Sequence, residues 1–573
     1  MNEPDTQNQL GFCKGAQTSD HIFTLTTCIE KYVTKNRKRI YSCFVDYAKA
    51  FDSVTVCREA LLFKLWKMGI QGRFFKCIEF MYQNSSTKVK LLNKLSDTID
   101  VVCGTEQGHP MSPELFKCFI HQLSKDINSI VGINVPVLGT AKVTHLLWAD
   151  DLVLLALDRE SLQSMLNVLQ SYCLEWGLAV NVSKTAIMAF NHTGRQLKDS
   201  LNFKLGESTI PSAREYCYLG IKFTLSGSLK SAQATLRQKA LRGYFAVKRM
   251  LDIRHIRKSI LFKIFDALIQ PIATYACQVW LPTTNLFKTL IDENSGSTRL
   301  KSIALDPLEN LHISFLKWTM NVHKYTSNAT VWGDCGRYPL GVVLSKLVFK
   351  YKERLHEMDS EGSNALVRHA YCEQKQLNLT WHRTLTAAKS RLETVETRRI
   401  YWPSQIRSGM KSWFERVWNV ERLSNRKLKF YNSIKHEFKE ELYLRLGLDN
   451  GISKRIAQLR SSSHNLNVET GRYGVNRLKP SNRVCKHCCT KDEATLELLL
   501  ELPFSEPIIE DEKHVLLTCP LYDDLRQQLL PTTRNLLEKD IGSIFENSVT
   551  IRDIGSFIFK IFERRFLTKN DSG

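Results

Sequence analysis

The chain has 573 residues, of which 43% are hydrophobic and 24% are charged, and this balance excludes a largely disordered protein. The chain is longer than a domain with a single hydrophobic core usually is, so several domains are expected. Lysine and arginine total 80 against 58 aspartates and glutamates, and the net charge of +22 favours a polyanionic partner, first of all nucleic acid. A merely solvated lysine surface is the alternative explanation of this charge.

Sixteen cysteines are too few for a disulfide scaffold of this size, and twelve of them are scattered singly from Cys13 to Cys372, which fits a reducing compartment. The N-terminus lacks the pattern of a signal peptide, and no run of about 18 uninterrupted apolar residues occurs. We therefore expect a soluble intracellular protein, located in the nucleus, the cytoplasm or both, without a membrane segment. The basic run Asn36–Arg39 is better explained by a solvated turn than by a nuclear signal.

The first part of the chain, from residue 10 to residue 225, alternates helical patterns with short β-rich segments and predicts an α+β fold. The β-rich segments are 43–47, a hairpin at 145–156, and 186–190.

A strongly basic helical segment follows from Leu229 to Gln270, where Pro271 interrupts it. Residues 284–306 contain Asn294-Ser295-Gly296-Ser297 and predict a surface linker. Beyond this linker the pattern is mostly helical to about residue 470. The tryptophans of the later helices are spaced for core packing: Trp318, Trp381, Trp413 and Trp418.

Two adjacent carboxylates, Asp150 and Asp151, stand where two apolar, strand-like runs meet. Burial of two neighbouring carboxylates is costly unless a cation offsets their charge. Taken alone, the pair is better explained by an acidic surface turn at the tip of a hairpin. A third acid, Asp46, follows the apolar strand that ends at Val45. Three carboxylates from separate strands are ligands suited to a pair of Mg²⁺ ions, which would activate a 3′-hydroxyl and stabilise a leaving pyrophosphate.

Two further segments accompany these acids. Gly104–Phe116 is a loop rich in glycine and proline that leads into a helix, and Gly108 would let the backbone approach a nucleic acid closely. Lys184 follows the acidic hairpin. Each segment taken singly is better explained by an ordinary loop, the first with a helix cap and the second with a solvated lysine.

Near the C-terminus, Cys485-x2-Cys488 is followed by His514-x4-Cys519, which is ligand spacing for tetrahedral zinc. The separation of the two halves is longer than a compact finger needs, and Cys489 is an alternative ligand. Reduced cysteines beside an unrelated histidine are the other explanation. Basic residues upstream, Arg460, Arg472, Arg477 and Lys479, would place positive charge beside this module for RNA or target-DNA docking.

Taken together, five blocks of the chain resemble the reverse transcriptases of non-LTR retrotransposons. They are FVDYAKAFDSV, GTEQGHPMSPELF, WADDLVLLA, GLAVNVSKT and YLG, in this order. QLGFCKGAQTSDHIFTL is similar to the family's block between fingers and palm, Tyr275–Trp280 to its thumb, and Gly336–Leu340 to a stretch after the thumb. The segment from Glu510–His514 through Cys519–Tyr522 is similar to the Cys-Cys-His-Cys terminus of several such proteins.

The resemblance implies an α+β right-hand polymerase palm with partial fingers, a helical thumb, a mostly helical C-terminal region and a small zinc-binding module. The implied boundaries are 1–225 for partial fingers and palm, 226–283 for the thumb, 284–306 for the linker, 307–480 for a helical basic region, 481–530 for a zinc-knuckle-like module and 531–573 for a helical tail.

The resemblance also implies the roles of individual residues. Asp46, Asp150 and Asp151 would be the catalytic aspartates that bind two Mg²⁺ ions, with Mn²⁺ as an alternative, and the Tyr47 carbonyl would be an extra ligand. Phe51 would exclude a ribose 2′-hydroxyl and so select dNTPs. Gln107 and Gly108 would contact the template and the nascent base pair. Lys184 would protonate the leaving pyrophosphate. One structural Zn²⁺ would be held by four residues: Cys485, Cys488, His514 and Cys519.

The expected partners are an RNA template, a DNA primer or target DNA, and dNTPs, with the basic helices at 229–263 along the primer-template duplex. Trp148 departs from the family, which more often has Tyr or Phe there. The chain also begins at the QLGFCKG block, so we expect part of the fingers and the endonuclease to be missing. The leading hypothesis is an RNA-directed DNA polymerase. The alternatives are an inactive remnant that binds nucleic acid and, less favoured, a Mg²⁺-dependent nuclease.

Overall fold

The computed structural model describes residues 7–48, 58–83, 85–101, 104–105, 109–197, 201–252, 256–291, 299–396, 403–473, 477–489, 508–530 and 540–570. The chain divides into two compact units by its internal contacts. Unit 1 comprises residues 1–235, 276–283 and 347–387, and unit 2 comprises residues 236–275, 284–346 and 388–573.

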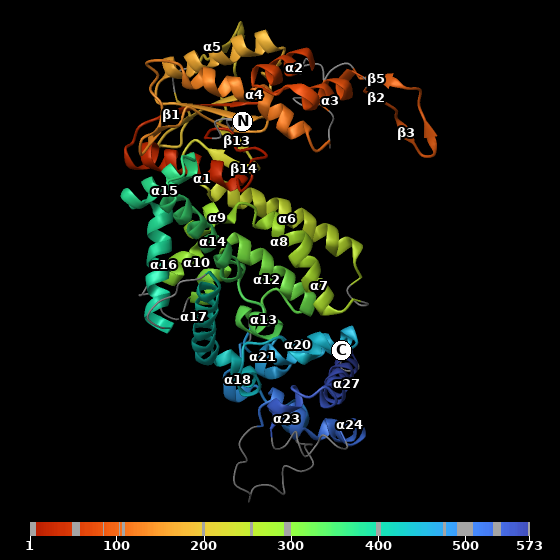
Figure 1. Ribbon diagram of the computed structural model, residues 1–573. Coiled ribbons are helices and arrows are strands. Elements are labelled where there is room, and N and C mark those ends of the chain that lie inside the picture. Colours follow the sequence, from red (N-terminus) through yellow and green to blue (C-terminus); the bar gives the residue numbers. More distant parts are fainter. Residues whose placement is uncertain are drawn as a thin grey trace, which may run out of the picture. The chain divides into compact units, whose positions relative to one another are not determined.

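Unit 1 is built on a four-stranded antiparallel sheet in the order β10-β1-β9-β8 (Figure 1). The strands are β1 (Ile40–Val45), β8 (His145–Trp148), β9 (Asp151–Ala156) and β10 (Ala186–Phe190). The predicted hairpin at 145–156 and the predicted strand at 186–190 are confirmed. β1 begins three residues earlier than predicted and ends before Asp46, because the apolar run buried between its two neighbours starts at Ile40.

Helices cover this sheet and complete its core. They include α1 (Thr18–Ile29), α4 (Ser112–Asn128) and α5 (Arg159–Trp176), and α15 (Leu366–Gln376) packs on α1. α5 packs on β9 and on α4, and the buried Phe116 and Leu166 join Leu152 in one hydrophobic cluster. Burial of such side chains contributes about 1.5–3 kcal/mol each and fixes the sheet that carries the acidic turn.

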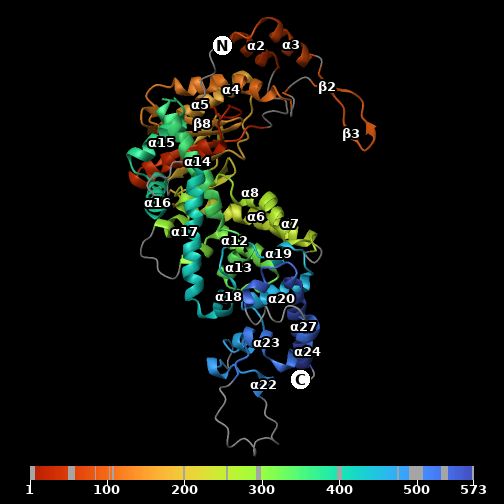
Figure 2. The same ribbon diagram turned by 60° about the horizontal axis from the view of Figure 1, so that its bottom comes forward.

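A second part of unit 1 consists of α2 (Arg58–Lys67), α3 (Gly72–Gln83) and two short ladders. The ladders pair β2 (Ser86–Thr87) with β5 (Ile99–Asp100) and β3 (Lys90–Leu91) with β4 (Lys94–Leu95). In both ribbon views this hairpin extends away from the sheet (Figures 1 and 2). The buried Arg58 donates hydrogen bonds to the carbonyls of Tyr82 (2.6 Å), Gly104 (3.3 Å) and Val101, so it ties the hairpin base to the start of the Gly104 loop.

Two more strands of unit 1 form a separate antiparallel hairpin, β13 (Glu215–Tyr218) with β14 (Ile221–Thr224). The Tyr216 ring of this hairpin stacks on Phe44 of β1, with ring centroids 4.5 Å apart and an interplanar angle of 15°. The hairpin therefore lies against the face of the sheet opposite to α5.

In unit 2, all described elements are helical. The long described helices with most or all residues in this unit include α6 (Lys230–Met250), α12 (Pro307–Met320), α17 (Pro403–Ser424) and α27 (Thr550–Asn570). The predicted basic helix 229–270 is divided into α6, α7 (Lys258–Ile264) and a continuation to α8 (Gln270–Ala273), where Pro271 occupies the first turn. α27 packs on α20 (Asn450–Arg460) and on α24 (Asp523–Leu529).

The predicted linker at 284–306 is wrong in its described parts. These parts form α10 (Asn285–Ile291) and α11 (Arg299–Ala304), and Phe287 and Leu290 are buried. Burial of their apolar side chains in the core of unit 2 stabilises these helices. The polar Asn294–Ser297 segment between them suggested a linker for the whole range. Residues 292–298 lie outside the described part of the chain.

A buried ionic network occupies the centre of unit 2. Arg460 is fully buried and binds both oxygens of Asp334, at 2.9 and 3.1 Å, and Glu441 at 3.1 Å. Lys435 also pairs with Glu441. The prediction that Arg460 supplies surface charge for docking is therefore wrong, because its guanidinium neutralises two buried carboxylates.

Three of the four tryptophans predicted to pack in cores are buried. Trp381, Trp413 and Trp418 are almost fully buried, whereas Trp318 is partly exposed. The Asn36–Arg39 run is an exposed loop before β1, as predicted. Within the described residues no single helix is long and apolar enough to cross a bilayer, and one bent pair, 258–273 with 277–283, meets the length and hydropathy criteria.

Candidate functional site

The acidic turn joins β8 to β9 at one end of the sheet. Leu147 pairs with Leu152 and Trp148 with Asp151, so Ala149 and Asp150 form the tip. Ala149 has a φ of 55°, in the left-handed region that costs an alanine roughly 1–2 kcal/mol. The turn therefore needs support from its surroundings to present both carboxylates.

The third acid reaches the same end of the sheet through the strand register. β1 lies beside β9 with Val45 opposite Leu152, so Asp46, the next residue, stands across from Asp151. The Asp46 N–H donates to Thr185 Oγ1 at 3.1 Å, and its carbonyl accepts from the Asn181 N–H at 2.7 Å. Asp46 is thereby fixed on both sides of its Cα.

The three carboxylates crowd one another electrostatically. Partial burial, then the charges of Asp150 and Asp46, raise the pKa of Asp151 to about 6. Burial, then Asp46, also raise the pKa of Asp150. No cation contributes to either of these pKa shifts, so the site carries an excess of negative charge that divalent cations would neutralise.

Lys184 lies in the turn that connects this site to β10. The turn is held by hydrogen bonds from the N–H groups of Lys184 (3.1 Å) and Thr185 (2.9 Å) to the Asn181 carbonyl. Its side chain is exposed, and Thr185, the next residue, holds Asp46. The buried Tyr47 forms a bridge with Val180 on the same connection. Lys184 is thus carried by a segment fastened directly to the third acid.

Two residues beside the acids were missed by sequence reasoning. Tyr216 is partly buried, and its pKa is raised to about 12 by burial and by the charges of Asp46 and Asp151. The alternating pattern of Glu215–Tyr218, just before Gly220, was the signal for a strand that brings this ring to the site.

The other missed residue is Gln9. It bridges to Leu147 of β8, and its side-chain oxygen accepts from the N–H groups of Gly11 (2.7 Å) and Ala149 (3.3 Å). Its side-chain nitrogen donates to the Ala149 carbonyl at 3.5 Å. A Cβ on Gly11 would lie only 2.3 Å from the Ala149 nitrogen, so glycine is required there. The N-terminal segment therefore holds Ala149, the left-handed residue before the two carboxylates, by hydrogen bonds with Gln9.

The structure thus brings together Asp46, Asp150 and Asp151 and places Lys184 on the adjoining turn. Three other predicted site residues, Phe51, Gln107 and Gly108, lie outside the described residues.

A second cluster lies in unit 2 at the predicted zinc ligands. One ligand atom from each of Cys485, Cys488, His514 and Cys519 falls within 4.8 Å of the others. The Cys519 Sγ lies 3.9 Å from each of the other two Sγ atoms, and Cys488 Sγ lies 3.4 Å from His514 Nε2. Zinc–sulfur bonds of about 2.3 Å at a tetrahedral centre would separate two sulfurs by about 3.8 Å. The cluster is therefore compatible with a zinc ion. The Cys489 side chain is outside the described residues.

Hydrogen bonds orient this cluster. Asp511 caps α23 (Glu512–Leu517) by accepting from the His514 N–H at 2.8 Å. His514 Nδ1 lies 3.0 Å from Thr518 Oγ1, which leaves Nε2 facing the thiols. A ligand histidine held in this way through its other ring nitrogen is typical of zinc sites.

Comparisons with known proteins find relatives of the part of the chain that contains the acidic turn. Residues 1–223 match the family model described as reverse transcriptase (RNA-dependent DNA polymerase). The chain is 27% identical over 249 residues to the retrovirus-related Pol polyprotein from type-1 retrotransposable element R2 of Nasonia vitripennis, covering 40% of this chain and 24% of that protein. It is 27% identical over 226 residues to the corresponding type-2 R2DM polyprotein of Drosophila melanogaster, covering 38% and 21%.

The chain therefore spans about a quarter of the length of these relatives. Among solved structures, an apo telomerase from Candida tropicalis aligns with 71% of this chain and 57% of its own, at 13% identity and a TM-score of 0.30. A score this low supports no conclusion about the fold.

Proposed function

We propose that this chain is an RNA-directed DNA polymerase of the non-LTR retrotransposon type, because residues 1–223 match the reverse transcriptase family model and the R2 polyproteins are similar to the chain. It would extend a DNA primer with dNTPs on an RNA template. The observation that carries the proposal is the meeting of Asp46, Asp150 and Asp151 at one end of the sheet, where burial and neighbouring carboxylates raise the pKa values of Asp150 and Asp151.

Carboxylate oxygens are ligands that divalent metal ions prefer. No cation contributes to the pKa shifts of Asp150 and Asp151, so the negative charge of the site is not neutralised by a neighbouring side chain. Asp46, Asp150 and Asp151 would hold two Mg²⁺ ions, with the Tyr47 carbonyl as an additional ligand. When bound, such ions lower the pKa of an attacking hydroxyl and neutralise charge on a leaving group.

The chain's own residues would contribute position and a proton. β1 and β9 fix the spacing of Asp46 and Asp151, and Gln9 holds the turn that carries Asp150. Lys184 would donate the proton from Nζ to the leaving pyrophosphate, as a general acid on the turn next to Asp46. Gln107, Gly108 and Phe51 would contact the base pair and select the deoxyribose, as the family resemblance implies.

Primer extension with purified protein, a DNA primer annealed to RNA, dNTPs and Mg²⁺ tests this proposal. The wild type should extend the primer, and Asp150→Asn and Asp46→Asn should each abolish extension. Asp97→Asn, which removes an exposed carboxylate from the hairpin of unit 1, is the matched control and should extend normally. If wild-type protein binds RNA but never extends, the inactive remnant is the better description.

We also propose that Cys485, Cys488, His514 and Cys519 hold one structural zinc ion. Elemental analysis should find about one zinc per chain, reduced in Cys485→Ser and unchanged in Cys217→Ser, which alters an exposed cysteine of unit 1. Metal-free protein with unchanged stability would contradict the zinc proposal.

A further inference from the structure

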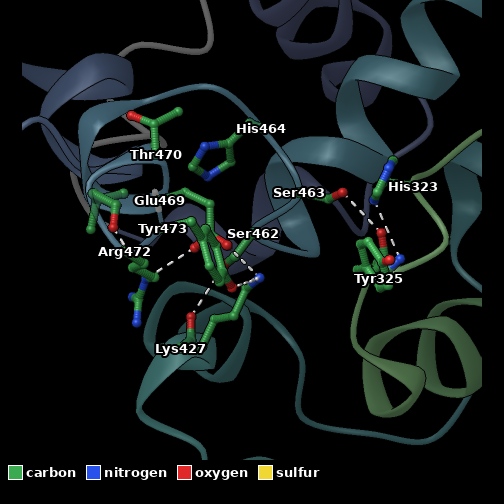
Figure 3. Close-up of polar contacts among 12 residues, drawn as sticks. His323, Tyr325, Lys427, Ser462, Ser463, His464, Glu469, Thr470, Arg472 and Tyr473 are labelled. Atoms are coloured by element: carbon green, nitrogen blue, oxygen red, sulfur yellow. Dashed lines mark hydrogen bonds and ion pairs between the residues drawn. The ribbon is translucent and has the colours of Figure 1, made fainter. Parts of the chain in front are cut away.

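Three turns of unit 2 meet at Ser462 and Ser463 (Figure 3). Ser463 Oγ lies 2.8 Å from Thr326 Oγ1, and Ser462 Oγ donates to the Lys427 carbonyl at 3.2 Å. Ser462 Oγ is also 3.3 Å from Glu512 Oε1, two residues before the candidate zinc ligand His514. Segments distant in sequence are therefore fastened to one point, beside the zinc cluster.

Two of these segments present aromatic rings to solvent. Tyr325 is 77% exposed and Tyr473 is 61% exposed. Figure 3 shows them on either side of the two serines. Isolated exposed aromatic residues are common. These two differ because each is accompanied by a lysine and anchored to the same buried junction.

The lysines orient the rings. Lys427 Nζ donates to the Tyr473 hydroxyl at 3.2 Å and lies 5.5 Å from the ring centroid. Lys324 Nζ lies 5.0 Å from the Tyr325 centroid, and the His323 ring lies 5.1 Å from the same ring. An exposed ring held by a cation loses little freedom when another flat group stacks on it.

The surrounding charge is positive. The buried Glu469 pairs with Lys427 and, at 3.0 Å, with Arg472. Arg472 and Arg477 are close enough to lower the pKa of Arg483, after the effect of burial. Further exposed cations follow on the same segments: Arg426, Lys429, Arg477 and Lys479. Like charges gathered in this way repel one another, and a polyanion would relieve the repulsion.

We propose that Tyr325 and Tyr473 form a stacking platform for unpaired bases of single-stranded RNA, whose phosphates contact the surrounding lysines and arginines. Rings with open faces suit unpaired bases, because bases paired in a duplex are already stacked on their neighbours. RNA is favoured over DNA because the proposed polymerase needs an unpaired RNA template, whereas its DNA would enter as a primer within a duplex. This surface goes beyond the polymerase site and uses none of its residues.

The test is photo-crosslinking of the full chain to a single-stranded RNA containing 4-thiouridine, without Mg²⁺ or dNTPs, followed by peptide mass spectrometry. Crosslinks should map to the peptides that carry Tyr325 and Tyr473. In a parallel titration with the same RNA, Tyr325→Ala and Tyr473→Ala should each weaken binding about 5- to 100-fold. Tyr473→Phe keeps the ring and should bind within about twofold of wild type. Phe566→Ala, another exposed aromatic residue of unit 2, is the matched control and should bind normally.

Circular dichroism checks that each variant is folded. The proposal is overturned if folded alanine variants bind RNA like the wild type and no crosslink maps to either peptide. Equal competition by single-stranded DNA of the same sequence overturns the assignment to RNA, and equal competition by duplex overturns the stacking. Since no polymerisation is measured, failure of the proposed polymerase would leave these outcomes unaffected.

Discussion

Replacing Gln9 by alanine removes the only side chain described here that bonds to both the N–H and the carbonyl of Ala149. These bonds, at 3.3 and 3.5 Å, are long, so together they stabilise the turn by about 1–2 kcal/mol. That is close to the roughly 1–2 kcal/mol by which the left-handed conformation disfavours Ala149. Without the glutamine the acidic turn should leave its native conformation in most molecules.

A free-energy change of about 1–2 kcal/mol corresponds to roughly a 5- to 30-fold change in population. We therefore expect Gln9→Ala to reduce the rate of single-nucleotide primer extension by roughly 5- to 30-fold. Ala149→Gly removes the cost of the left-handed conformation, by roughly 1 kcal/mol. The double variant Gln9→Ala with Ala149→Gly should thus regain about fivefold in rate.

The rate is measured with saturating RNA-primer duplex in rapid-quench experiments, and the melting temperature of each variant is measured in parallel. Asn8→Ala is the matched control, because Asn8 donates to the His145 carbonyl of β8 at 2.8 Å but does not touch the turn. It should lower stability and leave the extension rate within about twofold of wild type.

A wild-type rate for Gln9→Ala would refute this reasoning, as would an equal loss in Asn8→Ala. Failure of Ala149→Gly to restore activity in the Gln9→Ala background would show that the glutamine acts by some route other than support of the left-handed turn.

Three other predictions follow from the structure. Burial and the charges of Asp150 and Asp46 raise the pKa of Asp151 to about 6, above the roughly 4 of an unfolded chain, so ionisation of Asp151 destabilises the metal-free fold as the pH rises from about 4 to 6. The melting temperature of Asp151→Asn should therefore rise relative to that of the wild type across this window, and parallel curves of melting temperature against pH would contradict the prediction. Lys184→Ala should slow single-nucleotide primer extension by about 100-fold, because the leaving pyrophosphate would lose its proton donor, and a rate within about twofold of wild type would exclude the general-acid role. Asp334→Asn leaves the buried Arg460 without its main partner and should destabilise unit 2 by about 3–5 kcal/mol in denaturant unfolding. Breaking the exposed Arg564–Asp524 pair by Arg564→Ala should have a much smaller effect, and equal effects would contradict this account.

The acidic site could be predicted because its signals are local. Asp150 and Asp151 lie between two consecutive apolar runs, a pattern that favours a hairpin, and Asp46 ends a third such run, so strand periodicity and motif order indicated the same place. The candidate zinc ligands could also be predicted from their spacing in the sequence, and the structure brings the four side chains together.

The remaining features depend on partners distant in sequence. Gln9 meets Ala149 and Arg460 meets Asp334 across more than a hundred residues, and no periodicity in either segment specifies those contacts. Arg460 was predicted to be exposed because a positive charge near other positive charges suggests a surface, and only tertiary packing placed two carboxylates around it. The polar Asn294–Ser297 segment similarly obscured the helices on either side.

The pairing of Val45 with Leu152 has a consequence for how such a domain can change over time. Because side chains alternate between the two faces of a strand, a shift of one residue in either β1 or β9 would turn one aspartate away from the others. The length of chain between the two strands has no such effect. Insertions and deletions in the connecting segments should therefore be tolerated, whereas a single residue gained or lost within either strand should abolish the site.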